Sequence, residues 1–232
     1  MYLIPKKSQI VLNKYKFMKI KLFNVALGIA LAATTISASA QKNYTEGVVT
    51  LHTSMQGNAI EAKNYFRPDS SALTFTTGPA TIKILTDAKY SYFAVLVNVP
   101  VASIKKAAVA NPSEIEAILD ALPKFTFTPT TETKQISGFN CKKVVATDTK
   151  TSKAYDVWVT NDVTLPSDAF GSYYANIGGI PIQYTSFSQG QSSDVTVTSI
   201  ADTKAPAGTF GISADFDKIT MDDLKAMSGG GN

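Results

Sequence analysis

The chain has 232 residues, 44% hydrophobic and 17% charged, with one Cys, one His and one Trp. These numbers exclude collagen-like, low-complexity, coiled-coil and disulfide-scaffolded proteins. The formal net charge is +4, but six lysines and no acid precede residue 41, so the remainder carries 16 basic against 18 acidic residues. That balance gives no electrostatic reason to bind nucleic acid, and we expect no nucleic-acid partner.

The first 40 residues have the pattern of a secretory signal peptide. A charged start at Met18 precedes an apolar run over residues 22–33, and small residues at Ala38 and Ala40 fit a leader-peptidase site. We therefore expect a signal peptide over residues 18–40, with cleavage leaving Gln41 as the new N-terminus. The apolar run of about 12 residues is too short to span a bilayer, which takes about 20.

Residues 1–17 lie ahead of that signal, and we interpret them as an extension from an upstream start codon. The sequence leaves open whether Met1 or Met18 is the true start. Gln41 rather than a Cys comes directly after the expected cleavage site, and no later apolar run exceeds five residues. We expect a mature chain that is soluble, unanchored, without a transmembrane segment, and either periplasmic or secreted.

The mature chain is dominated by patterns typical of β-strands. Residues 82–84, 125–128 and 195–198 alternate apolar and polar side chains, which indicates half-buried antiparallel strands. The segment 90–97 is different because apolar residues lie on both of its faces, so apolar groups must cover both sides. We expect a single β-rich domain over residues 41–227, since nothing marks a second domain.

A helical insert is predicted over residues 101–122. Ile115 and Leu119 belong to an apolar stripe with helical spacing; Asn111 caps the helix and Pro123 ends it. A weaker stripe over 101–108 predicts a short helix upstream. A last helix follows Thr220, whose Asp three residues later resembles a capping box, and residues 228–232 read as a flexible Gly-rich tail.

Catalytic and metal-binding patterns are missing from the sequence. His52 is the single imidazole and lies in a strand pattern, where a surface His is expected, and Cys141 is interpreted as an inert, semi-buried thiol. Acids crowd residues 215–223 but fail the EF-hand spacing, so they read as a solvated loop and a helix cap. We expect no catalytic residues, no metal and no cofactor.

Four stretches carry a resemblance to a known family. They are VWVTNDV at residues 157–163, IGGIPI at 177–182, GTFGI at 208–212 and ISGFNCKK at 136–143. They resemble an uncharacterised family of exported bacterial envelope proteins with Trp-Tyr-Thr and Gly-Ile/Leu-Pro motifs. The likeness spans most of residues 130–227 and departs from the family pattern at Val159, Ser213 and Phe216, each of which remains compatible with a strand or packing role.

That family is similar in form to the outer-membrane lipoprotein carriers, in which a half-open β-barrel holds acyl chains under a helical lid. The resemblance implies a mainly β fold with a helical insert: a curved antiparallel sheet or half-open barrel covered by helices. It carries over no catalytic residue. A likeness of fold supports a functional expectation by analogy only.

The function expected first is a non-enzymatic protein that shelters a hydrophobic ligand between sheet and helical lid. The ligand would be a lipid, an acyl chain or a lipidated peptide. Trp158 either packs under the helices or lines a pocket. The candidates to line the cavity are Phe93, Val95, Val97, Ile115, Leu119 and Trp158.

The alternative is a structural or interaction protein of the cell envelope, with a solid core and a protein partner. An enzyme ranks third, because one His and no motif leave only carboxylate or metal chemistry. The ligand, the partner, the oligomeric state and the strand order remain open at this point.

Overall fold

Residues 40–232 form one unit of the chain, and the computed structural model describes residues 41–55, 57–166, 172–188 and 191–229 of it. The predicted signal peptide and the residues upstream of it lie outside the described residues. Gln41, the expected new N-terminus, is the first described residue and is exposed. Directly after it, β1 (Lys42–Asn43) pairs in parallel with β11 (Val163–Thr164).

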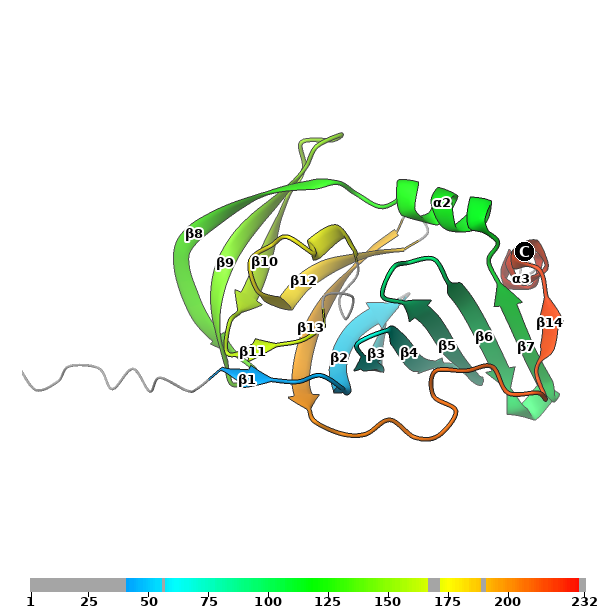
Figure 1. The fold of residues 1–232 in the computed structure, drawn as a ribbon. Coiled ribbons are helices and arrows are strands. Elements are labelled where there is room, and N and C mark those ends of the chain that lie inside the picture. The colour runs from blue at the N-terminus through cyan, green and yellow to red at the C-terminus, as the bar shows by residue number, and fades with distance from the viewer. Residues whose placement is uncertain (1–40, 56, 167–171, 189–190, 230–232) are drawn as a thin grey trace, which may run out of the picture. The chain divides into compact units, whose positions relative to one another are not determined.

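The other strands of the described residues form one sheet of twelve, in the order β14-β7-β6-β5-β4-β3-β2-β13-β12-β10-β9-β8. The sheet is curved and mostly antiparallel, and β8 and β14 lie at its two edges, so it is not closed into a barrel (Figure 1). The predicted mainly β fold with a curved antiparallel sheet is confirmed. In chain order, the first six strands of this sheet are β2 (Gly47–Met55), β3 (Asn58–Arg67), β4 (Ser70–Thr77), β5 (Ala80–Asp87), β6 (Phe93–Val99) and β7 (Ile104–Val109). The next six in chain order are β8 (Phe125–Ile136), β9 (Phe139–Asp148), β10 (Ala154–Thr160), β12 (Ile180–Ser188), β13 (Gln191–Ala201) and β14 (Asp217–Ile219).

The second half of the predicted helical insert is correct. Helix α2 (Pro112–Asp120) begins after Asn111, whose side-chain oxygen accepts from the Glu114 N–H while the Glu114 carboxylate accepts from the Asn111 N–H. This reciprocal capping box satisfies backbone donors at the first turn that the helix itself leaves without partners. Figure 1 shows α2 on the connection from β7 to β8.

The first half of that insert is wrong. After a short 3-10 turn, η1 (Pro100–Ala102), the chain forms strand β7 rather than a helix. β7 pairs with β6 on one side and with β14 on the other. Ala107 and Ala108 are both fully buried although they point to opposite faces. Apolar residues on both faces of a central strand imitate a weak helical stripe, and pairing in the sheet overrides the local pattern.

The C-terminal segment wraps around the edge of the sheet at β7. Phe210, Ile212 and Phe216 pack on one face of β6, against Ala94 and Leu96. The chain then forms β14 along β7, and α3 (Met221–Gly229) lies in a cluster with Phe93 and Val95, on the opposite face of β6. Both faces of β6 are therefore covered by apolar groups, as the pattern over 90–97 predicts.

Helix α3 begins at the predicted place. Thr220 and Asp223 exchange capping hydrogen bonds, with Thr220 Oγ1 accepting from the Asp223 N–H at 3.0 Å and the Thr220 N–H donating to Asp223 Oδ2 at 3.1 Å. The helix runs to Gly229, two residues into the segment expected to be a Gly-rich tail. Residues 230–232 lie outside the described part of the chain.

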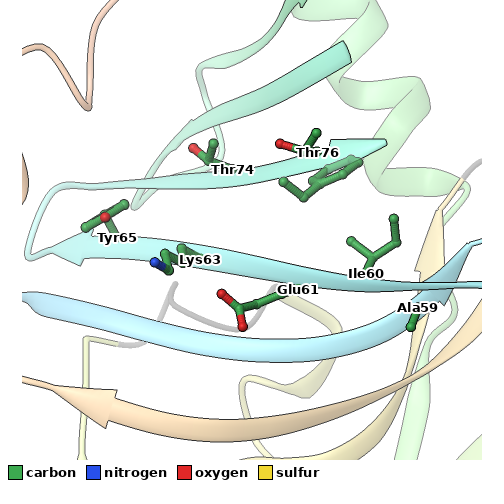
Figure 2. Close-up of a pocket in the computed structure, with 8 residues that line it drawn as sticks. Ala59, Ile60, Glu61, Lys63, Tyr65, Thr74 and Thr76 are labelled. Carbon is green, nitrogen blue, oxygen red and sulfur yellow. The ribbon is translucent and has the colours of Figure 1, made fainter. Parts of the chain in front are cut away.

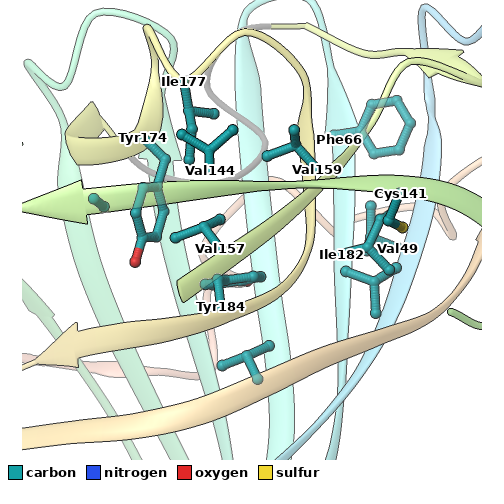
Figure 3. Close-up of a cluster of buried hydrophobic side chains, with 13 residues drawn as sticks. Val49, Phe66, Cys141, Val144, Val157, Val159, Tyr174, Ile177, Ile182 and Tyr184 are labelled. Atoms are coloured by element: carbon teal, nitrogen blue, oxygen red, sulfur yellow. The ribbon is translucent and has the colours of Figure 1, made fainter. Parts of the chain in front are cut away.

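The largest cluster of buried side chains fills the curve between β8 and β13. It includes Val157, Ile182 and Val197, all fully buried, and the 3-10 helix η2 (Ser172–Tyr174) contributes Tyr174. Figure 3 shows Tyr174, Val157 and Tyr184 close together inside this curve. We call the side of the sheet that faces this cluster the inner face, and the opposite side, against which Phe210 packs, the outer face.

Candidate functional site

The register of strands β3 to β7 aligns apolar side chains in rows on the inner face. In one row Phe75 lies opposite Ile82, and Ile82 opposite Val97. In the next row Leu73 lies opposite Ile84, and Ile84 opposite Val95. Directly opposite residues of antiparallel strands point to the same face, so these rows form one apolar surface.

Five members of these rows form the surface that we call the apolar stripe. Each is half-buried. None belongs to the three clusters of buried apolar side chains that the described residues form. The apolar stripe consists of Leu73, Phe75, Ile82, Ile84 and Val97. An apolar surface that the core leaves partly open is the kind of feature that marks a ligand or partner site.

Four of the six sequence-predicted cavity residues come together beside the apolar stripe. Phe93 and Val95 of β6 share a cluster with Ile115 and Leu119 of α2. Val97, a fifth candidate, belongs to the stripe itself. The cluster also holds Met221 and Leu224 of α3. The sequence thus identified the β6 and α2 members, while the contribution of β4 and β5 follows only from strand register.

Trp158 lies in the other half of the sheet, in β10, and the structure does not bring it near the other candidates. It packs at the margin of the largest cluster. The Lys134 Nζ lies 4.0 Å from the centre of its ring, and the same ammonium donates to Gln183 Oε1 at 2.8 Å. Trp158 therefore has a cation–π partner from β8 rather than a contact with α2 or α3 among its described interactions.

The rows of the inner face end on polar groups. Ser71 and Thr86, one row beyond Leu73 and Ile84, share a hydrogen bond of 2.8 Å between their hydroxyls. In β7, next to the edge strand β14, Lys106 lies opposite Val97, and its Nζ lies 2.8 Å from Asp217 Oδ2. The apolar stripe is therefore bordered by hydroxyls on one side and by an ion pair at one corner.

Two pockets that the sequence did not predict lie outside the inner face. The first, of about 410 Å³, opens over β3 and β4 and is lined largely by outer-face residues such as Glu61, Lys63, Tyr65 and Thr74, with Ile60 and Phe75 (Figure 2). The second, of about 430 Å³, is polar and lies at the start of β7. Its lining residues are Asn98, Pro100, Ser103, Lys105, Asp215 and Asp217. None of the six predicted cavity residues lines either pocket.

His52 and Cys141 lie in different surroundings, one exposed and one buried. His52 is exposed on β2 and its Nε2 lies 3.4 Å from Glu61 Oε2. Cys141 is buried, and desolvation, together with the negative charge of Asp162, raises its pKa to about 11. A thiol with such a pKa is almost wholly protonated at neutral pH and is a poor nucleophile.

The tyrosines of the largest cluster pack against other aromatic side chains. Tyr174 stacks on Phe125 with ring centres 5.6 Å apart, and its hydroxyl donates to the Thr185 carbonyl at 2.8 Å. Burial raises the pKa of Tyr173, Tyr174 and Tyr184, which keeps their hydroxyls protonated. These groups satisfy a core and are not poised for acid–base chemistry.

The crowded acids near the C-terminus are occupied by cations and by a helix cap. Asp215 and Asp217 pair with Lys105 and Lys106, and Asp223 caps α3. Lys105, followed by Ser213, lowers the pKa of Asp215 to about 2. The residues that the structure describes contain no group of three potential metal ligands.

Within the same described residues, neither helix is long and apolar enough to cross a membrane. This finding concerns helices only.

Comparison with solved structures finds distant likenesses. PNGF-II in two crystal forms is 19% and 20% identical over 78% and 79% of this chain, with a TM-score of 0.46 for each. The chain spans only about a third of PNGF-II, 32% and 33% of the two chains. An uncharacterised conserved protein from Thermus thermophilus is 8% identical over 80% of this chain and 94% of its own, with a TM-score of 0.47.

No curated protein matches the chain. A family model does: the domain of unknown function DUF4412 matches residues 45–171, from β2 through the end of β11. That match covers more than half of the chain and confirms the expectation of an uncharacterised family. The chain therefore belongs to the DUF4412 family.

Proposed function

We propose that this protein is exported and binds a hydrophobic ligand, without catalysis, on the apolar stripe beside α2. The ligand class is an acyl chain, carried on a lipid or a lipidated peptide. The observation that carries the proposal is the half-buried row of Leu73, Phe75, Ile82, Ile84 and Val97, which no cluster of the core absorbs. The signal-like leader over 18–40 supports export to the periplasm or the medium.

Three features support an acyl chain over a compact aromatic ligand. The stripe extends over three neighbouring strands spaced about 4.8 Å apart, so it offers an acyl chain a continuous series of apolar contacts across the sheet. Its side chains are aliphatic apart from Phe75. The polar groups at its borders, such as the Lys106–Asp217 pair, leave its centre without a hydrogen-bonding group that would select a polar ligand.

Helix α2 supports the role of a cover beside the stripe. Its buried Ile115 and half-buried Leu119 hold it against β6 and β7. Strand β7 precedes the helix and β8 follows it. The capping box at Asn111 keeps its first turn formed, which places the helix at a defined position next to Val95.

The test uses the protein exported through its own leader and purified without detergent. Titration with the fluorescent fatty acid dansyl-undecanoate should give saturable binding of one probe per chain. Ile84→Lys places a charge in the middle of the stripe and should weaken binding at least tenfold. Thr81→Lys, on the same strand but pointing to the outer face, is the matched control and should bind as the wild type does.

The circular dichroism spectra of both variants should match the wild type, since Ile84 is half-buried and its new ammonium can extend toward solvent. A wild-type protein that binds no probe would overturn the proposal. Recovery of a stoichiometric envelope protein by that same wild type would then favour the structural or interaction role. Equal weakening by the two lysine variants would place the ligand elsewhere.

A further inference from the structure

The apolar surface of the inner face continues beyond the stripe, underneath the two helices. The row of Leu73 and Ile84 runs on to Val95 of β6 and Ala108 of β7 without a break in register. Val95 is half-buried and Ala108 fully buried, in the cluster that α2 and α3 form with β6 and β7. One continuous apolar row is therefore partly open and partly covered by the chain itself.

We propose that α3 is a displaceable cover of this row, so that long acyl chains compete with α3 for the inner face whereas short ones occupy only the stripe. This inference rests on the proposed function and adds chain-length selection to it.

The contacts of α3 are those expected of a helix that a ligand can displace. Of its residues, Met221 is buried and Leu224 half-buried in the shared cluster, while Asp222, Asp223, Lys225 and Met227 are exposed. Its capping hydrogen bonds join Thr220 to Asp223 and so do not anchor the helix to the sheet. Elements with few buried apolar contacts open at the lowest free energy.

The strand that leads into α3 is equally short. β14 has three residues and pairs with β7 from Asp217 to Ile219. In its Lys106–Asp217 ion pair, 30% of the Lys106 and 73% of the Asp217 side chain is accessible, and a pair with one exposed partner contributes little to holding the strand. By contrast, α2 is joined to the longer strands β7 and β8 at its two ends, whereas α3 follows the three-residue β14, so α3 is the helix more easily displaced.

The test compares octanoate with palmitate as competitors of dansyl-undecanoate. Met221→Asp removes the buried anchor of α3 and should tighten palmitate binding at least fivefold while leaving octanoate binding unchanged. Met227→Asp, on the exposed side of the same helix, is the matched control and should change neither. Leu224→Ala is a milder second variant and should change palmitate binding in the same direction as Met221→Asp.

Hydrogen exchange supplies an independent readout in the unaltered protein. Saturating palmitate should increase exchange in residues 221–229, and saturating octanoate should not. Unchanged protection of α3 with palmitate bound, or equal effects of Met221→Asp on the two fatty acids, would overturn this inference while leaving the proposed function intact. Failure of the wild type to bind any of the three fatty acids would overturn both.

Discussion

The inner face of the sheet is covered to different extents in its two halves. Between β8 and β13 the curve is filled: Val157, Ile182 and Val197 are fully buried, and Tyr174 packs onto them from η2. Between β4 and β6 the inner face has the same apolar character, but Ile82 and Ile84 remain half-buried. Protein interiors are normally packed without gaps, so the half that the chain leaves incompletely covered is the better candidate for binding something else.

The comparison also separates the two faces of the first half. The outer face of β6 is sealed by Phe210, Ile212 and Phe216, with the Arg67 guanidinium 4.5 Å above the Phe210 ring. The inner face of the same strand is covered only where α2 and α3 reach it. The open apolar surface of β6 is therefore on the inner face, at Val97.

The largest expected effect contrasts two isoleucines. Ile182→Ala removes a fully buried side chain from the filled half and should lower the free energy of unfolding by about 3–4 kcal/mol, including the cavity left behind. Ile84→Ala in the apolar stripe should cost only about 1–2 kcal/mol, because solvent already reaches that side chain. Urea denaturation measures both; equal losses would mean that the stripe is ordinary core.

The join between the halves can be tested at Gly47, at the start of β2. A Cβ there would lie 2.3 Å from the Ala201 carbonyl oxygen and 3.0 Å from the Phe66 ring. Gly47→Ala should therefore destabilise the protein by about 1–3 kcal/mol through overpacking. Gly211→Ala meets nothing within 4 Å and should change stability by no more than about 0.5 kcal/mol. A tolerated Gly47→Ala would show that β2 and β13 are less tightly joined than the structure indicates.

Helix α2, which covers part of the inner face, depends on its N-terminal capping box. Asn111→Ala removes the side-chain acceptor of the capping box and should cost about 1 kcal/mol. Hydrogen exchange should rise in residues 112–120 while β9, β10 and β12 keep their protection. Asn111→Ser, which retains an acceptor, should recover most of the loss. An increase spread evenly over the chain would contradict the independence of the two halves.

The smallest expected effect is a pH dependence confined to the C-terminal wrap. Lys105 and Ser213 lower the pKa of Asp215 from 3.8 to about 2, so the folded state favours the charged carboxylate. A carboxyl group whose pKa is lowered by folding stabilises the folded state at pH values above its pKa in the unfolded chain. This contribution is lost as the pH falls from about 4 to about 2. Asp215→Asn should remove it.

The measurement is the exchange of residues 213–219 at pH 4 and pH 2 in both proteins. In the wild type, protection should drop more between these pH values than in Asp215→Asn. An identical drop would assign the acid sensitivity to other carboxylates.

Several local features could be predicted because short-range chemistry decides them. Asn111, Glu114 and Pro112 specify the start of α2 within a few residues, and Thr220 with Asp223 does the same for α3. Alternation of apolar and polar residues identified parts of β5, β8 and β13 and the mainly β character of the fold. The apolar pattern over 90–97 correctly required cover on both faces of β6.

Other features depend on partners far away in the chain. Residues 101–108 were predicted as a short helix from a weak apolar stripe. Only pairing with β6 and β14 makes Ile104–Val109 a strand. Trp158 was predicted to line the same cavity as Phe93, yet they lie in different halves of the sheet. No local signal links Leu73 and Ile84 to Val95.

Local patterns along the chain were enough for the mainly β character, the two capped helices, the surface position of His52, and membership of an uncharacterised family. Long-range packing set the strand order, the wrap of residues 210–229 around the sheet edge, and the place where an apolar face stays partly open. The physical reason is the range of the interactions. Capping and alternation act over a few residues, whereas the cover of a sheet face depends on which distant segment packs against it.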